Sequence, residues 1–127
     1  MQSPLLELAA TRGKLMELLA ISHSRMDRDF HERAFMTGIM SLLDSLLGMP
    51  FQEIFSQVSL ASDVEDAILH QEGKLGKLLL LVKTAEEDDF VAASTLLTDL
   101  RINPRHLMRA QLEAMRWANL LREEAAG

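Results

Sequence analysis

The segment Ala34 to Pro50, AFMTGIMSLLDSLLGMP, has a single charged side chain, Asp44. At about 100° per residue, its large apolar side chains fall on one arc of a helix: Phe35, Met36, Ile39, Met40, Leu42, Leu43, Leu46 and Leu47. The opposite side carries small residues: Ala34, Thr37, Gly38, Ser41, Ser45 and Gly48. An exposed helix face would normally carry Lys, Glu or Arg. We therefore expect a central helix, with its large residues in the core and its small face against a neighbouring helix.

Asp44 needs hydrogen-bond partners in such apolar surroundings, because an unpaired buried carboxylate costs several kcal/mol. One interpretation is structural: Asp44 accepts backbone N–H groups near Phe51 and Gln52, or pairs with an Arg or Lys. The alternative is that it serves as a ligand or general base. No histidine lies on the same face to support that role.

Helical periodicity extends over almost the whole chain, while alternating strand patterns are nearly absent. The sequence therefore predicts an all-α fold of about six to seven helices. Ser62 and Glu65 form a candidate capping box, with a stop at Gly73. The expected helices run over about 4–23, from the polar patch at 22–29 to Leu47, and over 50–57, 63–71, 75–85 and 86–97, with a last one from Asn103-Pro104.

The size and charge of the chain limit its function. Its 127 residues contain 13 Lys and Arg against 19 Asp and Glu, a net charge of −6, with 48% hydrophobic residues. This fits one compact domain over 1–127. The acidic balance argues against nucleic-acid and membrane partners, and the lack of cysteine excludes thiol catalysis. No signal-peptide or membrane-spanning pattern is present, which favours a cytoplasmic protein.

Two polar groups are candidates for chemistry. His23, Asp27 and His31 are spaced four apart and would share one face of a continuous helix as metal ligands. A solvated bend with local ion pairs is the alternative. Another candidate is a nucleotide or phosphate patch on one side of the last helix, formed by Arg105, Arg109 and Arg116. Because Glu113 lies among them, a solvated face is favoured. We expect no catalytic, metal or cofactor site.

The stretch AFMTGIMSLLDSLLGMPFQEIFSQVSLASDVEDAILHQEGKLGKLLLLV, residues Ala34 to Val82, resembles the HDOD domain, an HD-related output domain of bacterial signalling proteins. The likeness is strongest to the HDOD half of proteins that also contain an EAL domain. EAMRWA, at Glu113 to Ala118, resembles the closing helix of that family. The resemblance covers the C-terminal portion of the family's domain and implies packing roles for Phe35, Gly38, Ser41, Asp44, Gly48, Pro50, Gly73, Gly76 and Trp117.

The resemblance implies a compact HD-like helical bundle without the metal ligands of HD phosphohydrolases. This chain also lacks any His-Asp dipeptide. The expected function is a non-enzymatic regulatory or interaction module in cyclic di-GMP signalling, with protein partners or a linked EAL domain. The alternatives are a metal-dependent phosphohydrolase related to HD domains and a small DNA-binding or scaffolding bundle.

Because the family's N-terminal helices have no counterpart here, we also expect self-association as a homodimer. The first helix would form the interface through Leu5, Leu8, Leu15 and Leu19. In the competing arrangement this helix folds back and seals the bundle of a monomer.

Overall fold

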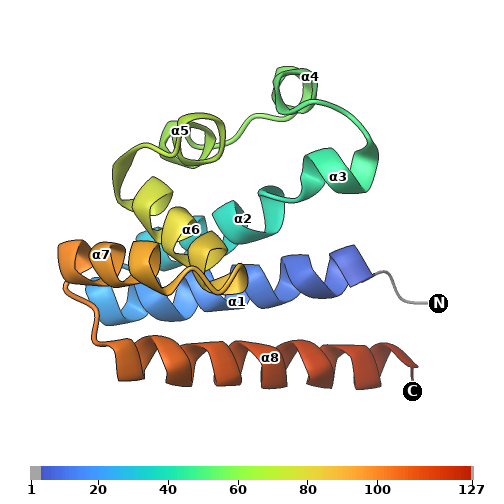
Figure 1. Ribbon diagram of the computed structural model, residues 1–127. Coiled ribbons are helices and arrows are strands. Elements are labelled where there is room, and N and C mark those ends of the chain that lie inside the picture. The colour runs from blue at the N-terminus through green and yellow to red at the C-terminus, as the bar shows by residue number, and fades with distance from the viewer. Residues whose placement is uncertain (1–3, 127) are drawn as a thin grey trace.

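The computed structural model describes residues 4–126, which form eight α-helices and no strand (Figure 1). The all-α prediction is therefore confirmed. The helices are α1 (Pro4–His23), α2 (Arg28–Met40), α3 (Leu43–Leu47), α4 (Phe51–Gln57), α5 (Ser62–His70), α6 (Gly73–Glu86), α7 (Phe90–Leu100) and α8 (Pro104–Ala126).

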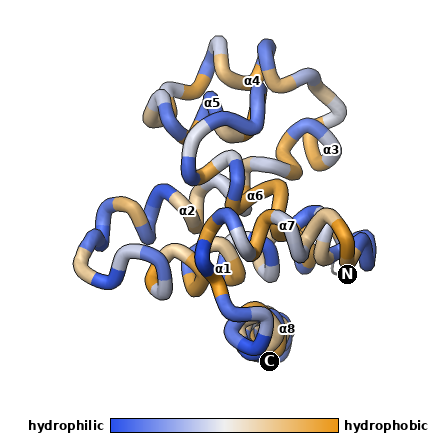
Figure 2. Tube along the Cα trace, turned by 60° about the vertical axis from the view of Figure 1, so that its left-hand side comes forward, coloured by the Kyte–Doolittle hydropathy of each residue, from blue (hydrophilic) through white to orange (hydrophobic). Residues whose placement is uncertain are grey.

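Helices α1 and α6 occupy the centre of the bundle. Helix α1 packs on α2, α8 and α6, while α6 also packs on α5 and α7. Helices α1 and α8 lie side by side and run in opposite directions (Figure 1). Helix α8 forms one margin of the molecule, and α3 to α5 form the opposite margin (Figure 2).

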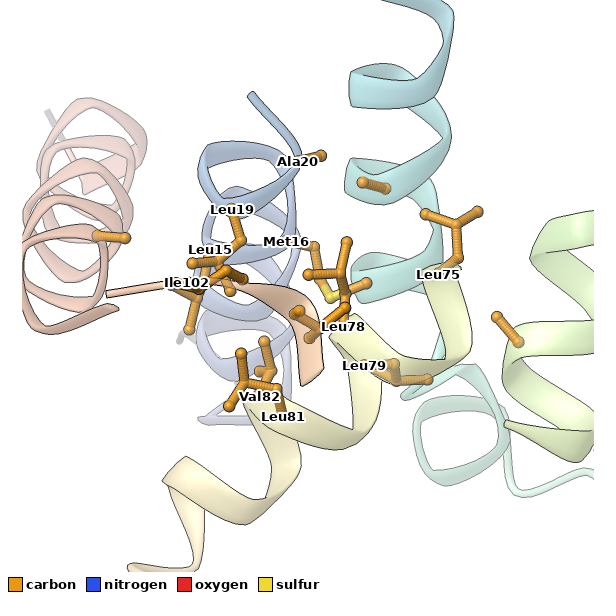
Figure 3. Packing of buried hydrophobic residues seen from close by; sticks show 14 of the residues in the cluster. Leu15, Met16, Leu19, Ala20, Leu75, Leu78, Leu79, Leu81, Val82 and Ile102 are labelled. Atoms are coloured by element: carbon orange, nitrogen blue, oxygen red, sulfur yellow. The ribbon is translucent and has the colours of Figure 1, made fainter. Parts of the chain in front are cut away.

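The hydrophobic core lies between α1, α2 and α6. Met16 and Leu19 of α1 are fully buried, as are Leu78 and Leu79 of α6. Leu78 points toward Met16, while Leu15 and Leu19 lie near Ile102 from the segment before α8 (Figure 3). The apolar run of α6 is thus buried on several sides, and α6 takes the central position that the sequence suggested for 34–50.

The starts of α1 and α8 agree with the sequence, whereas the helix expected over 86–97 begins later, at Phe90. Helix α1 begins at Pro4, where the missing proline N–H costs no hydrogen bond. Asp89 caps α7 by accepting from the backbone N–H of Ala92 at 3.2 Å. Asn103 Oδ1 accepts from the backbone N–H of Arg105 at 2.8 Å, where α8 begins. Short polar side chains therefore determine these boundaries locally.

The predicted capping box at Ser62 is wrong. Ala61 is the N-cap of α5, and no side chain caps this end of the helix. The carbonyl oxygen of Ala61 accepts from the backbone N–H groups of Val64 and Glu65, both at 3.1 Å. The helix also ends before Gly73, with Gln71 in the left-handed conformation at φ 55°.

The prediction of one helix up to Leu47 is also wrong, since α2 ends at Met40 and α3 begins at Leu43. The hydroxyl of Ser41 donates to the carbonyl oxygen of Gly38 at 2.7 Å. Such local bonds compete with the regular helix ladder. This break explains why the bundle has eight helices in 4–126 rather than the expected six or seven.

The small face of α2 packs on a neighbouring helix, as expected. Ala34 and Thr37 are fully buried. At Gly38, the backbone of α2 packs directly against the backbone of α1 at Gly13. A Cβ added at Gly38 would lie 2.6 Å from Gly13 Cα and 2.7 Å from the carbonyl oxygen of Arg12. Only glycine fits this crossing.

The large face is less buried than the sequence indicated. Leu42 is buried, but Met36 is 36% exposed and Leu47 is 55% exposed. The large residues would share one arc only on a single straight helix. The break at Ser41 changes the direction of the large side chains that follow it. The segment therefore packs mainly through its small residues.

Candidate functional site

A buried polar network joins α1, α6 and the end of α2. Arg12 is 6% exposed, and its Nε and Nη2 donate to the two carboxylate oxygens of Glu86 at 3.0 and 2.6 Å. Its Nη1 donates to the hydroxyl of Ser41 at 2.8 Å. This two-bond geometry is the strong form of an Arg–carboxylate pair. Ser41 is among the residues that the family resemblance selected, whereas no sequence signal pointed to Arg12 and Glu86, which are 74 positions apart.

Two residues that the resemblance selected contact each other. The rings of Phe35 and Trp117 meet edge to face, with centroids 5.9 Å apart at 85°. The ammonium group of Lys14 lies 5.4 Å from the Trp117 ring centroid. Edge-to-face pairs and cation–π contacts each contribute roughly 0.5–1.5 kcal/mol. The cluster joins α1, α2 and α8 and has a packing role.

Asp44 is half-buried, in the first turn of α3. Its Oδ1 accepts from the backbone N–H of Ser45 at 2.8 Å. This is a backbone acceptor role, as the structural interpretation held. The partner is wrong, however, because within 4–126 no hydrogen bond joins its carboxylate to Phe51, Gln52 or a basic residue.

The remaining family-matched residues shape turns and close contacts. Gly48 ends α3 in the left-handed conformation at φ 66°. Pro50 precedes α4 as its N-cap, and Gly73 begins α6 at φ 75°. A Cβ added at Gly76 would lie 2.3 Å from the carbonyl carbon of Gln71, so the turn before α6 requires a glycine there.

The candidate metal ligands His23, Asp27 and His31 do not lie on one continuous helix. His23 ends α1, whereas Asp27 caps α2 by accepting from the backbone N–H of Phe30 at 3.1 Å. His31 Nε2 lies 2.6 Å from the carbonyl oxygen of Ser24. Throughout the described part of the chain, no three His, Asp or Glu side chains are grouped to hold a metal ion.

The expected local ion pairs in the bend are also not found among residues 4–126. Arg33 instead pairs with Asp63 of α5 at 2.8 Å, which connects two helices. Arg105, Arg109 and Arg116 are exposed on α8, as the solvated interpretation expected.

The first helix is not an open surface. Leu15 is 4% exposed and Leu19 is fully buried beneath α6 and α8. These two leucines are therefore buried within the chain and do not offer a surface to a second copy, while self-association itself stays a prediction. Leu8 is 36% exposed. None of the helices described in 4–126 combines the length and apolar character needed to cross a membrane.

Comparison with known proteins shows two relatives. The chain is 31% identical over 115 residues to cyclic di-GMP phosphodiesterase CdgJ of Vibrio cholerae serotype O1, covering 90% of this chain and 26% of that protein. It is 29% identical over 117 residues to the uncharacterized protein YuxH of Bacillus subtilis, covering 92% of this chain and 27% of that protein. No protein-family model and no solved structure matches.

The chain therefore spans about a quarter of the length of these curated relatives, while nearly all of it takes part in the match. The match thus corresponds to one segment of each relative. A cyclic di-GMP phosphodiesterase is one of the proteins that this all-α chain resembles.

Proposed function

We propose that this chain is a non-enzymatic regulatory module of HDOD type that acts in bacterial cyclic di-GMP signalling. The observation that carries the proposal is the 31% identity to CdgJ, a cyclic di-GMP phosphodiesterase, over 90% of this chain. The match covers only 26% of CdgJ, which suits a module working beside a separate catalytic domain.

The roles of the polar residues support a structural rather than a catalytic use. Asp27 caps a helix, and His31 contacts a backbone carbonyl oxygen. Arg12 donates two hydrogen bonds to the carboxylate of Glu86. General acid–base catalysis needs a positioned group that can reach a substrate proton. These side chains instead have partners within the bundle.

We further propose that the module acts through protein contacts, either with a linked EAL domain or as a homodimer. Exposed apolar side chains on α8 support this. Met108 is 63% exposed, and Leu112 and Met115 are each 59% exposed. At about 100° per residue they share one face of α8, and contiguous apolar surface is typical of interaction sites.

Deletion of the gene in its native host is expected to change the cellular level of cyclic di-GMP several-fold. Mass spectrometry of cell extracts measures the nucleotide. The wild-type chain should restore the level, and a Gly38→Leu chain, which cannot form the α1–α2 crossing, should not. An unchanged level in the deletion strain would contradict the proposed signalling role.

A further inference from the structure

A cavity of about 510 Å³ lies between the end of α1 and the first half of α8. Its apolar wall consists of Leu18, Ile21 and Ala110. A volume of this size falls within the range of about 300–1,000 Å³ that is usual for small-molecule sites. The cavity is separate from the Arg12 network and from the Phe35–Trp117 contact.

Two arginines from different elements line this cavity. Arg25 lies in the turn after α1, and Arg109 lies on α8. Within residues 4–126, neither has a hydrogen-bonded or ion-paired partner. Both arginines are exposed and line the same cavity, on a protein of net charge −6. Arginine binds phosphate and carboxylate oxygens through its planar fork of N–H donors.

His106 also lines the cavity, and its Nε2 is buried without a hydrogen-bond partner. Buried polar atoms nearly always have a partner, so this nitrogen requires an explanation. Exchange of the ring nitrogens by a side-chain flip, or a small rotation, would offer a polar atom to a bound molecule. The imidazole is thus a third polar group of the same cavity.

Ser22 and Glu113 also line the cavity, and Glu113 restricts the class of ligand that fits. Its carboxylate accepts hydrogen bonds and repels a second anion. A fitting ligand therefore has an anionic end for the arginines, an apolar body for the wall, and adjacent N–H donors for Glu113. Guanine offers two neighbouring N–H groups, whereas adenine offers an acceptor nitrogen beside its amino group.

We propose that this cavity binds a nucleoside monophosphate, with the phosphate on Arg25 and Arg109 and with guanine favoured over adenine by Glu113. The proposal goes beyond the regulatory role and does not depend on it. Arg105 and Arg116, which the sequence grouped with Arg109, do not line the cavity. Arg25 and Arg109 line the same cavity because α1 and α8 pack antiparallel (Figure 1).

Isothermal titration of the purified chain with GMP tests the site. GMP is expected to bind more tightly than AMP and more tightly than inorganic phosphate. Arg25→Gln and Arg109→Gln should each weaken GMP binding at least about tenfold, the usual effect of losing a charge-assisted contact. Arg105→Gln is the matched control on the same helix and should leave the affinity unchanged. Glu113→Gln should reduce the preference for GMP over AMP.

Three results would overturn the assignment. The first is no heat with millimolar GMP while circular dichroism shows a folded chain. The second is equal weakening by Arg105→Gln and Arg109→Gln, which would indicate general charge attraction. The third is equally tight binding of another ligand. Inorganic phosphate binding as tightly as GMP would show that the apolar wall contributes nothing, and AMP binding as tightly would show that Glu113 does not select guanine.

Discussion

Replacing Gly38 with alanine is expected to lower the free energy of unfolding by about 3 kcal/mol, at the upper end of the usual cost of overpacking. The added methyl group would meet backbone atoms of Gly13 and Arg12 at 2.6–2.7 Å. Backbone atoms cannot turn aside as a side chain can, so α1 and α2 must move apart. Urea denaturation followed by circular dichroism measures the change.

Gly13→Ala is the matched comparison on the facing helix. A Cβ there would lie 2.8 Å from Ile39 Cγ1, a side-chain atom, and 3.1 Å from the carbonyl oxygen of Phe35. The expected loss is about 1–2 kcal/mol. Adding Ile39→Ala should make Gly13→Ala less costly, which a double-mutant cycle would show. A Gly38→Ala chain as stable as the wild type would contradict the close crossing.

Replacing Glu86 with alanine is expected to lower the free energy of unfolding by about 2–3 kcal/mol. The substitution leaves the buried Arg12 guanidinium with Ser41 as its remaining side-chain partner. Breaking a buried ion pair typically costs about 3–5 kcal/mol. We expect less here because the Glu86 side chain is 28% exposed, so water can partly replace it. Chemical denaturation again gives the measurement.

The control for this pair removes both charges at once. Arg12→Met with Glu86→Leu should be within about 1 kcal/mol of the wild type, since apolar replacements of a whole buried pair are often neutral. Glu86→Gln, which keeps an acceptor, should lie between the wild type and Glu86→Ala. If Glu86→Ala alone had no effect on stability, the network would not hold α6 against α1.

Local signals in the sequence predicted much of the fold. Pro4 and Asn103 each act within one helical turn, and α1 and α8 begin beside them as expected. The helix expected over 86–97 begins four residues later, at Phe90, because α6 continues to Glu86. The break after Met40 was not predictable in this way. It accompanies a bond from Arg12, which is distant in sequence, to the hydroxyl of Ser41. The helix end thus combines a local bond, from Ser41 to Gly38, with a tertiary bond, from Arg12 to Ser41.

The contacts of the polar side chains were likewise not predictable from local sequence signals. The spacing of His23, Asp27 and His31 suggested one face, but the turn at 24–27 divides them between two helices. The pairing of Arg12 with Glu86 and the approach of Arg25 to Arg109 across one cavity both depend on how α1 packs. The charged residues were visible in the sequence. Their partners required the three-dimensional arrangement.

The most direct test of the proposed regulatory role is a hydrolysis assay on the purified chain. The chain is incubated with cyclic di-GMP and Mg²⁺ or Mn²⁺, and the nucleotides are separated by chromatography. The proposal predicts no loss of cyclic di-GMP beyond that in a protein-free control. Metal-dependent hydrolysis that disappears in a folded His23→Ala variant would contradict it and establish the chain as a phosphohydrolase.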